Sequence, residues 1–213
     1  MPMSAPVFAE SFQAQFLELL RWRRDVRRFR SDPVPKTLLH ELLAAAEMAP
    51  SVGLSQPWRF VQVDEPARRA RILENFQSCN ARALASLEGP DAKTYATLRL
   101  AGLSDAPCHL AAFAEPNPEQ GRVLGRMTMP ETAIYSAVMA VHTLWLMART
   151  VGLGVGWVSI LDPAGVCSVL DVPPHWVFLG YLCIGYPMVE SDTPELERLG
   201  WERRREGVTL LQR

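Results

Sequence analysis

The stretch Arg23-Arg24-Asp25-Val26-Arg27-Arg28-Phe29 surrounds one carboxylate with four arginines, and six of the ten residues from 21 to 30 are arginine. A guanidinium offers a planar fork of donors that matches phosphate oxygens. The whole chain is nearly neutral, with 22 Lys and Arg against 23 Asp and Glu, so the cluster is a local feature. Without interleaved stacking aromatics it favours a phosphate monoester over nucleic acid. Asp25, taken alone, could be only a salt-bridge partner.

Regular structure is predicted on both sides of this stretch from the spacing of apolar residues. Helices are expected over 11–22, 35–43, 65–87, 130–151 and 163–170, and strands over 59–64, 109–114, 154–161 and 177–184. The helix over 130–151 is apolar on nearly every side, which predicts burial all round in the core or a subunit interface. A membrane span is the competing interpretation, but its uncharged stretch is shorter than the roughly 20 residues a bilayer needs.

The composition predicts one α+β domain over residues 1–213. The 213 residues are 48% hydrophobic, enough for one substantial core. The four cysteines are scattered, so neither a disulfide framework nor a metal site is expected. Residues 1–10 lack the features of a targeting peptide, and we expect a cytoplasmic protein.

Further blocks accompany the arginine stretch. One is Ala49-Pro50-Ser51-Val52-Gly53-Leu54-Ser55-Gln56-Pro57-Trp58, and another is Gly152-Leu153-Gly154-Val155-Gly156-Trp157-Val158-Ser159. The second is not a dinucleotide fingerprint, because its glycines close a helix and open a strand. The remaining blocks are Gly125-Arg126-Met127-Thr128-Met129-Pro130-Glu131-Thr132, Gly185-Tyr186-Pro187 and Trp201-Glu202-Arg203-Arg204-Arg205.

Together these blocks resemble the nitroreductase family over about residues 16–205, and within it the dimethylbenzimidazole synthases. Ordinary members usually carry Ser or Thr where this chain has Asp25, and Asn where it has Leu54. An Asp between the arginines is characteristic of the synthase branch. The block over residues 125–132 is similar to an interface motif of that branch.

The resemblance implies a nitroreductase-like α+β fold, with a central mixed sheet flanked by helices and a C-terminal extension, residues 188–213, that wraps the partner of a homodimer. It implies Asp25 and Ser159 as catalytic residues: Asp25 moves a proton and Ser159 helps to orient it. The residues implied to bind FMN are Arg23, Arg24, Asp25, Val26, Arg27, Ser51, Ser55, Gln56, Leu100, Gly156, Ser159 and Arg204.

The implied activity is an oxygen-dependent fragmentation of reduced FMN to dimethylbenzimidazole and erythrose 4-phosphate, which supplies the lower ligand of vitamin B12. Residues 77–104 are the expected lid, because a reactive flavin must be shielded from water. The lid would leave little room for a nicotinamide, so a separate reductase is expected to supply reduced FMN. Neither nucleic acid nor a membrane is an expected partner.

Two alternatives remain open at this point. One is an NAD(P)H-dependent flavin reductase or nitroreductase of the same fold. The other is a non-catalytic protein that uses the arginines to bind RNA or to store flavin.

Overall fold

The computed structural model describes residues 5–98 and 100–213. Outside these ranges lie residues 1–4, which belong to the segment expected to lack a targeting peptide, and Arg99, which belongs to the expected lid. The elements follow in the order α1 (Glu10–Trp22), α2 (Lys36–Ala46), η1 (Val52–Leu54), β1 (Trp58–Gln62), α3 (Pro66–Ala85), α4 (Gly89–Thr97), α5 (Gly102–Asp105), β2 (Cys108–Ala114), α6 (Thr132–Thr150), β3 (Gly154–Val158), α7 (Pro163–Leu170), β4 (Val177–Gly185) and α8 (Glu195–Arg198).

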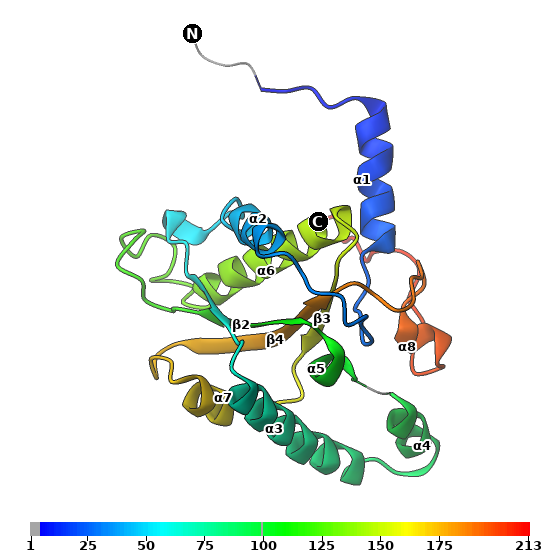
Figure 1. The fold of residues 1–213 in the computed structure, drawn as a ribbon. Helices are drawn as coiled ribbons and strands as arrows, with labels where there is room; N and C mark the ends of the chain where they lie inside the picture. Colours follow the sequence, from blue (N-terminus) through cyan, green and yellow to red (C-terminus); the bar gives the residue numbers. More distant parts are fainter. Residues whose placement is uncertain (1–4, 99) are drawn as a thin grey trace.

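The four strands form one sheet in the order β1-β2-β4-β3 (Figure 1). All three strand pairs are antiparallel, so the expected mixed sheet is wrong for the part of the chain that the structure describes. The one parallel pairing here is an isolated bridge between Asp25 and Val155. Strands β1 and β3 therefore form the two edges of the sheet.

Helices cover both faces of the sheet, with α2 and α6 on one side and α3 and α7 on the other (Figure 1). The central strand β2 is buried along its whole length, as expected for a strand covered on both faces. Its side chains alternate between the two cores: Leu110 and Ala112 pack with α2 and α6, whereas Ala111 and Phe113 pack with the α3 and α7 side.

Helix α6 lies where it is expected, but it is not buried all round. Ala137, Val141 and Leu144 are fully buried against the sheet. On the other side, Tyr135 is 52% and Met139 40% exposed. The apolar pattern all round therefore combines a core face with an uncovered face. No helix in the two described ranges is long and apolar enough to cross a membrane.

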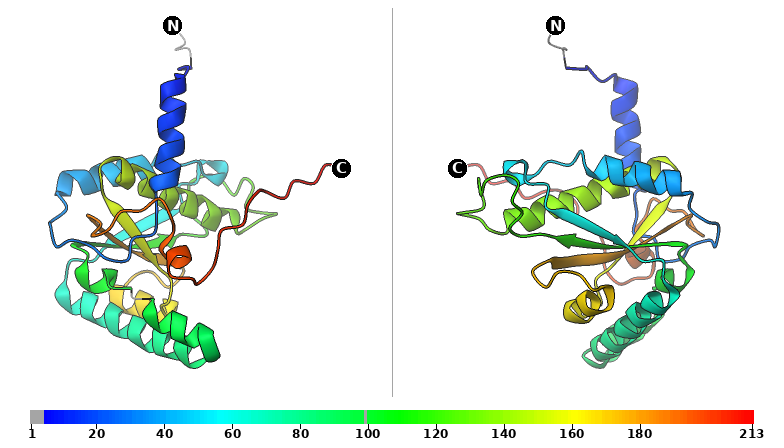
Figure 2. Two further views of the ribbon diagram at one scale, coloured as in Figure 1. Left: turned by 90° about the vertical axis from the view of Figure 1, so that its right-hand side faces the viewer. Right: turned by 60° about the vertical axis from the view of Figure 1, so that its left-hand side comes forward.

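Both ends of the chain leave the body (Figure 2). Helix α1 has no buried residue and presents Phe12 and Phe16 to an apolar groove of about 600 Å³ beside α6. At the other end, Val208 and Leu210 are 93% and 77% exposed. The first part of the C-terminal segment, by contrast, returns to the chain's own body through α8.

Candidate functional site

The arginine stretch leaves α1 and runs along the outer edge of β3. The Val26 amide donates to the carbonyl of Val155 at 3.1 Å, and Asp25 forms the parallel bridge to the same residue. This close approach requires a glycine at position 156, because a Cβ there would lie 2.2 Å from the carbonyl oxygen of Val26. Val26 and Gly156 thus bring residues 23–28 onto the strand edge.

Asp25 is held by the backbone of β3. Its Oδ1 accepts a hydrogen bond from the Trp157 amide at 2.9 Å, and its Oδ2 accepts one from Arg27 Nε at 3.4 Å. The side chain is 39% exposed. Burial is the largest influence and raises the pKa of Asp25; the Trp157 amide and Arg27 lower it, and Glu195 raises it further. The raised pKa brings this carboxyl closer to the range in which it can exchange a proton at neutral pH.

The arginines next to Asp25 meet groups from distant parts of the chain. Arg24 Nε donates to the carbonyl of Asp192 at 2.7 Å, and the guanidinium of Arg23 lies 4.9 Å from the ring centre of Trp145. Burial lowers the pKa of both arginines, and the nearby charge of Arg204 lowers it further. Three positive charges therefore lie close together without enough carboxylates to neutralise them.

One buried nitrogen of this group lacks a partner. Arg27 Nη1 makes no hydrogen bond to any described residue. A cavity of about 70 Å³ lies over the stretch; its lining residues are Arg24, Asp25, Val26, Arg27, Arg28, Val189, Ser191, Thr193, Glu195 and Arg198. An anion in this cavity would meet four arginines as well as the carboxyl groups of Asp25 and Glu195.

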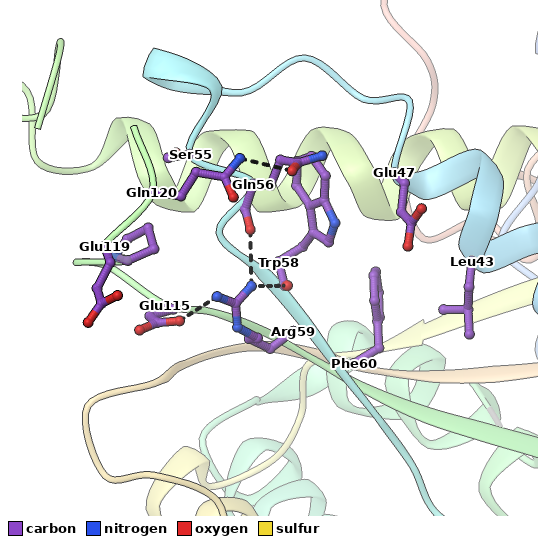
Figure 3. A pocket seen from close by; sticks show the side chains of 11 residues that line it. Leu43, Glu47, Ser55, Gln56, Trp58, Arg59, Phe60, Glu115, Glu119 and Gln120 are labelled. Carbon is purple, nitrogen blue, oxygen red and sulfur yellow. Dashed lines mark hydrogen bonds and ion pairs between the residues drawn. The ribbon is translucent and has the colours of Figure 1, made fainter. Parts of the chain in front are cut away.

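The second group of predicted site residues precedes β1. The backbone N–H of Gln56 donates to Ser51 Oγ at 3.1 Å. Ser55 is 1% exposed, and its hydroxyl has no partner among the residues that the structure describes. Ser55 and Gln56 line a cavity of about 900 Å³ together with Arg59 and Glu115 (Figure 3).

The two groups lie at opposite edges of the sheet. Asp25 is beyond β3, whereas residues 51–56 lead into β1, and the strand order separates these edges by three strand spacings, roughly 14 Å. A single chain therefore holds two separate groups of predicted site residues. We call residues 23–27 the first half-site and residues 51–56 the second half-site.

Two predicted site residues, Ser159 and Leu100, belong to neither group. Ser159 is exposed and follows the last residue of β3, so its expected place on a buried strand is wrong. No hydrogen bond joins Ser159 to Asp25 within the described ranges. Leu100 lines a different cavity of about 340 Å³, between α3 and α4, together with Phe76 and Tyr95.

Several groups around Asp25 were not predicted. The Trp157 amide, the Asp192 carbonyl and the Trp145 ring are brought to the arginines by strand pairing and by the return of the C-terminal segment. A backbone group has no signal in the sequence, and Trp145 lies on α6 at a position that the apolar pattern explains fully. Glu195, in an acidic segment, carried no specific signal either.

Comparison with known proteins identifies the family of the chain. Residues 20–186 match the model of the nitroreductase family. The chain is 56% identical over 204 residues to a 5,6-dimethylbenzimidazole synthase of Rhodospirillum rubrum, covering 95% of this chain and 96% of that protein. It is 48% identical to a protein of the same name from Rhodobacter capsulatus, covering 92% and 94%.

A solved structure shows the same fold. The crystal structure of an iodotyrosine deiodinase bound to FMN and 3-iodo-L-tyrosine superimposes with a TM-score of 0.75 at 23% identity, covering 92% of this chain and 98% of that one. The chain therefore belongs to the nitroreductase family, and its relatives at 48% and 56% identity are 5,6-dimethylbenzimidazole synthases.

Proposed function

We propose that this chain is a 5,6-dimethylbenzimidazole synthase that consumes reduced FMN and O2 and releases dimethylbenzimidazole and erythrose 4-phosphate, for the lower ligand of vitamin B12. The observation that carries the proposal is Asp25, a half-buried carboxyl with a raised pKa inside an arginine cluster. The identity to the named relatives supports the same reading.

The residues present fit FMN. The unpartnered Nη1 of Arg27, together with Arg23, Arg24 and Arg204, provides the donors and charge that a phosphate monoester needs. Gly156 keeps the strand edge free of side-chain atoms where the chain passes closest. Ser51, Ser55 and Gln56 would contribute polar atoms from the other half-site.

FMN, when bound, supplies the redox-active ring, the ribityl chain that is cleaved and the phosphate that anchors both. The arginines orient the molecule through this phosphate. Asp25, held by the Trp157 amide, holds or moves a proton at the ribityl chain next to the phosphate. Ser159, two residues after Trp157 in the chain, would assist Asp25.

Residues 77–104 are proposed to cover the flavin. Within this segment α4 contacts α3, because the Tyr95 hydroxyl donates to Asn80 Oδ1 at 2.8 Å. A closed cover excludes water from the reaction and leaves little room for a nicotinamide. Reduced FMN would then come from a separate reductase, and we place the reaction in the cytoplasm.

The two half-sites favour a homodimer in which each flavin contacts both subunits. Residues 23–27 of one subunit would meet residues 51–56 of the other. The exposed apolar residues at the C-terminus and on α1 and α6 are the surfaces that such a partner would cover. Residues 188–213 are the proposed arm around the partner.

The test is to mix the purified protein with chemically reduced FMN in air and to identify the products by mass spectrometry. The expected result is dimethylbenzimidazole without added NADH. Asp25→Asn should retain FMN binding, since the amide oxygen can still accept from Trp157, but should lower product formation at least about 100-fold, as expected on losing a general acid or base. Unchanged turnover in Asp25→Asn, or rapid NADH oxidation with a nitroaromatic, would reject the proposal.

A further inference from the structure

Two loops of the second half-site are interlocked through glycines. A Cβ on Gly53 would lie 2.8 Å from the carbonyl oxygen of Gly121, and a Cβ on Gly121 would lie 2.8 Å from that of Gly53. A Cβ on Gly125 would lie 2.7 Å from the side chain of Val52. The backbones are in such close contact that residues 51–56 and 121–125 must move together.

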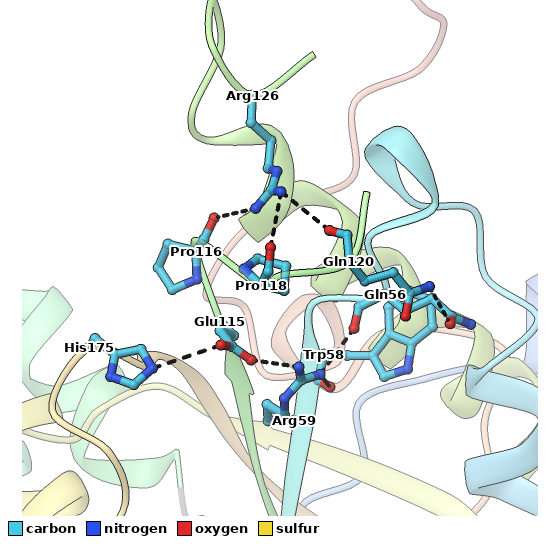
Figure 4. A network of polar contacts seen from close by, with 9 residues as sticks. All are labelled: Gln56, Trp58, Arg59, Glu115, Pro116, Pro118, Gln120, Arg126 and His175. Carbon is cyan, nitrogen blue, oxygen red and sulfur yellow. Dashed lines mark hydrogen bonds and ion pairs between the residues drawn. The ribbon is translucent and has the colours of Figure 1, made fainter. Parts of the chain in front are cut away.

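Arg126 holds residues 116–120, the segment just before the second of these loops. It is 6% exposed and forms no ion pair with a described residue; instead it donates to the carbonyls of Pro116, Pro118 and Gln120 at 3.2, 3.1 and 3.3 Å (Figure 4). A buried guanidinium that satisfies three carbonyls leaves the backbone of residues 116–120 little freedom. The backbone of Gln120 is therefore set by Arg126.

The Gln120 side chain then reaches across to the first loop. Its Nε2 donates to the Leu54 carbonyl at 2.6 Å and to Gln56 Oε1 at 3.0 Å. Figure 3 shows the bond to Gln56. Leu54 and Gln56 have φ angles of 56° and 42°, in the left-handed region that non-glycine residues occupy at a cost. The two bonds from Gln120 hold this costly conformation in place.

These bonds also fix the polarity of the Gln56 amide. Because Oε1 is engaged by Gln120, the NH2 group of Gln56 is turned away from Gln120 and remains available as a donor in the 900 Å³ cavity. It meets no acceptor in the part of the chain that the structure describes. Gln56 is thus preorganised to bind a ligand that offers a hydrogen-bond acceptor.

We infer that Gln120 is a positioning residue, which presents the NH2 group of Gln56 to an acceptor atom of the flavin bound to the partner subunit. The fitting ligand chemistry is a planar heterocycle with carbonyl oxygens or unprotonated ring nitrogens. The inference rests on the proposed function in naming that ligand as FMN and in placing it between two subunits.

Gln120→Glu tests the inference by reversing the polarity. A carboxylate only accepts, so the Gln56 amide must turn its NH2 group toward the new carboxylate and its oxygen toward the ligand. In Gln120→Glu the ligand loses its hydrogen bond from the Gln56 NH2 group and meets the Gln56 oxygen instead, so FMN binding should weaken about tenfold. Gln120→Ala leaves the Gln56 amide free to rotate and should weaken FMN binding about threefold. The hydrogen bond to the Leu54 carbonyl is lost in Gln120→Glu and in Gln120→Ala alike, so the difference between the two variants reports on the Gln56 amide. Asn117→Asp is the matched control; it adds the same charge nearby and should leave the affinity unchanged.

A double-mutant comparison separates positioning from a general structural effect. If Gln120 acts through Gln56, adding Gln120→Glu to Gln56→Ala should change FMN affinity no further. Affinity is measured by quenching of the fluorescence of oxidised FMN, so a wild-type protein that binds FMN but forms no benzimidazole would reject the proposed function without removing this test. Equal losses from Gln120→Glu with and without the Gln56 side chain, or no loss at all, would overturn the inference.

Discussion

The most strongly perturbed histidine lies in the core, away from the proposed chemistry. His109 is 2% exposed, with Nε2 3.0 Å from the Ala106 carbonyl and Nδ1 3.0 Å from the Tyr181 hydroxyl. Because a carbonyl can only accept, Nε2 carries the proton and Nδ1 accepts from Tyr181. Burial lowers the pKa of His109 to about 4.

This lowered pKa predicts a loss of stability in acid. A histidine whose pKa is lower in the folded state contributes stability that is present above the unfolded value, 6.5, and is lost as the pH falls through about 4. The contribution amounts to about 3 kcal/mol of unfolding free energy. Urea unfolding between pH 7 and 4 should show this dependence, and His109→Gln should flatten it. The exposed His40→Gln is the control, and equal pH profiles for His109→Gln and the wild type would contradict the prediction.

At this scale the sequence predicts the identity of the site residues better than their surroundings. Arg23, Arg24 and Asp25 are contiguous, so their proximity follows from the chain itself. The hydrogen bond from Trp157 and the exposure of Ser159 depend on where β3 ends, and the apolar pattern predicts that strand three residues too long.

Among the elements, helix α4 of the proposed lid packs against α3, whose last residues belong to the same lid segment. Its Tyr95 donates one hydrogen bond to Asn80 on α3, and its ring lies 6.0 Å from that of Trp201 in the C-terminal segment. Tyr95→Phe keeps the ring contact and removes the hydrogen bond, so it should weaken lid closure alone.

Tyr95→Phe should therefore raise the ratio of hydrogen peroxide to dimethylbenzimidazole about two- to tenfold, which is the effect of one lost hydrogen bond, with FMN affinity nearly unchanged. A peroxide assay and product quantification on the same reaction measure the ratio. Asp91→Asn changes an exposed side chain on the same helix without removing the Tyr95 hydroxyl and serves as the control. An unaltered ratio would argue against α4 as a lid.

The elements themselves were largely predictable, because local spacing determines them. Helix α7 has the predicted bounds, and α1, α3 and β2 differ from them by a few residues at most. The exposed face of α6 could not be predicted, since an apolar face toward a core and one toward solvent or a partner have the same sequence pattern.

The arrangement of the whole molecule could not be predicted from the sequence pattern. Strand order depends on pairings between distant segments, and here it places residues 23–27 and 51–56 at opposite edges although few residues separate them in the chain. The resemblance implied one list of FMN-binding residues, whereas the structure places most of that list in two separate half-sites and leaves Leu100 in a third cavity. This division is what makes the shared-site proposal testable with mixed subunits.

Mixed dimers should recover activity from two inactive parents. One parent is Asp25→Asn, which retains the second half-site; the other is Ser51→Ala/Gln56→Ala, which retains the first. In a heterodimer, one shared site then combines both defects while the other combines both intact halves. With random mixing, half of the dimers are mixed and half of their sites are intact, so product formation should reach about a quarter of the wild-type rate per subunit. If each site lay within a single chain, no intact site could form, and activity that stays at the level of the parents after unfolding and joint refolding would exclude a shared site.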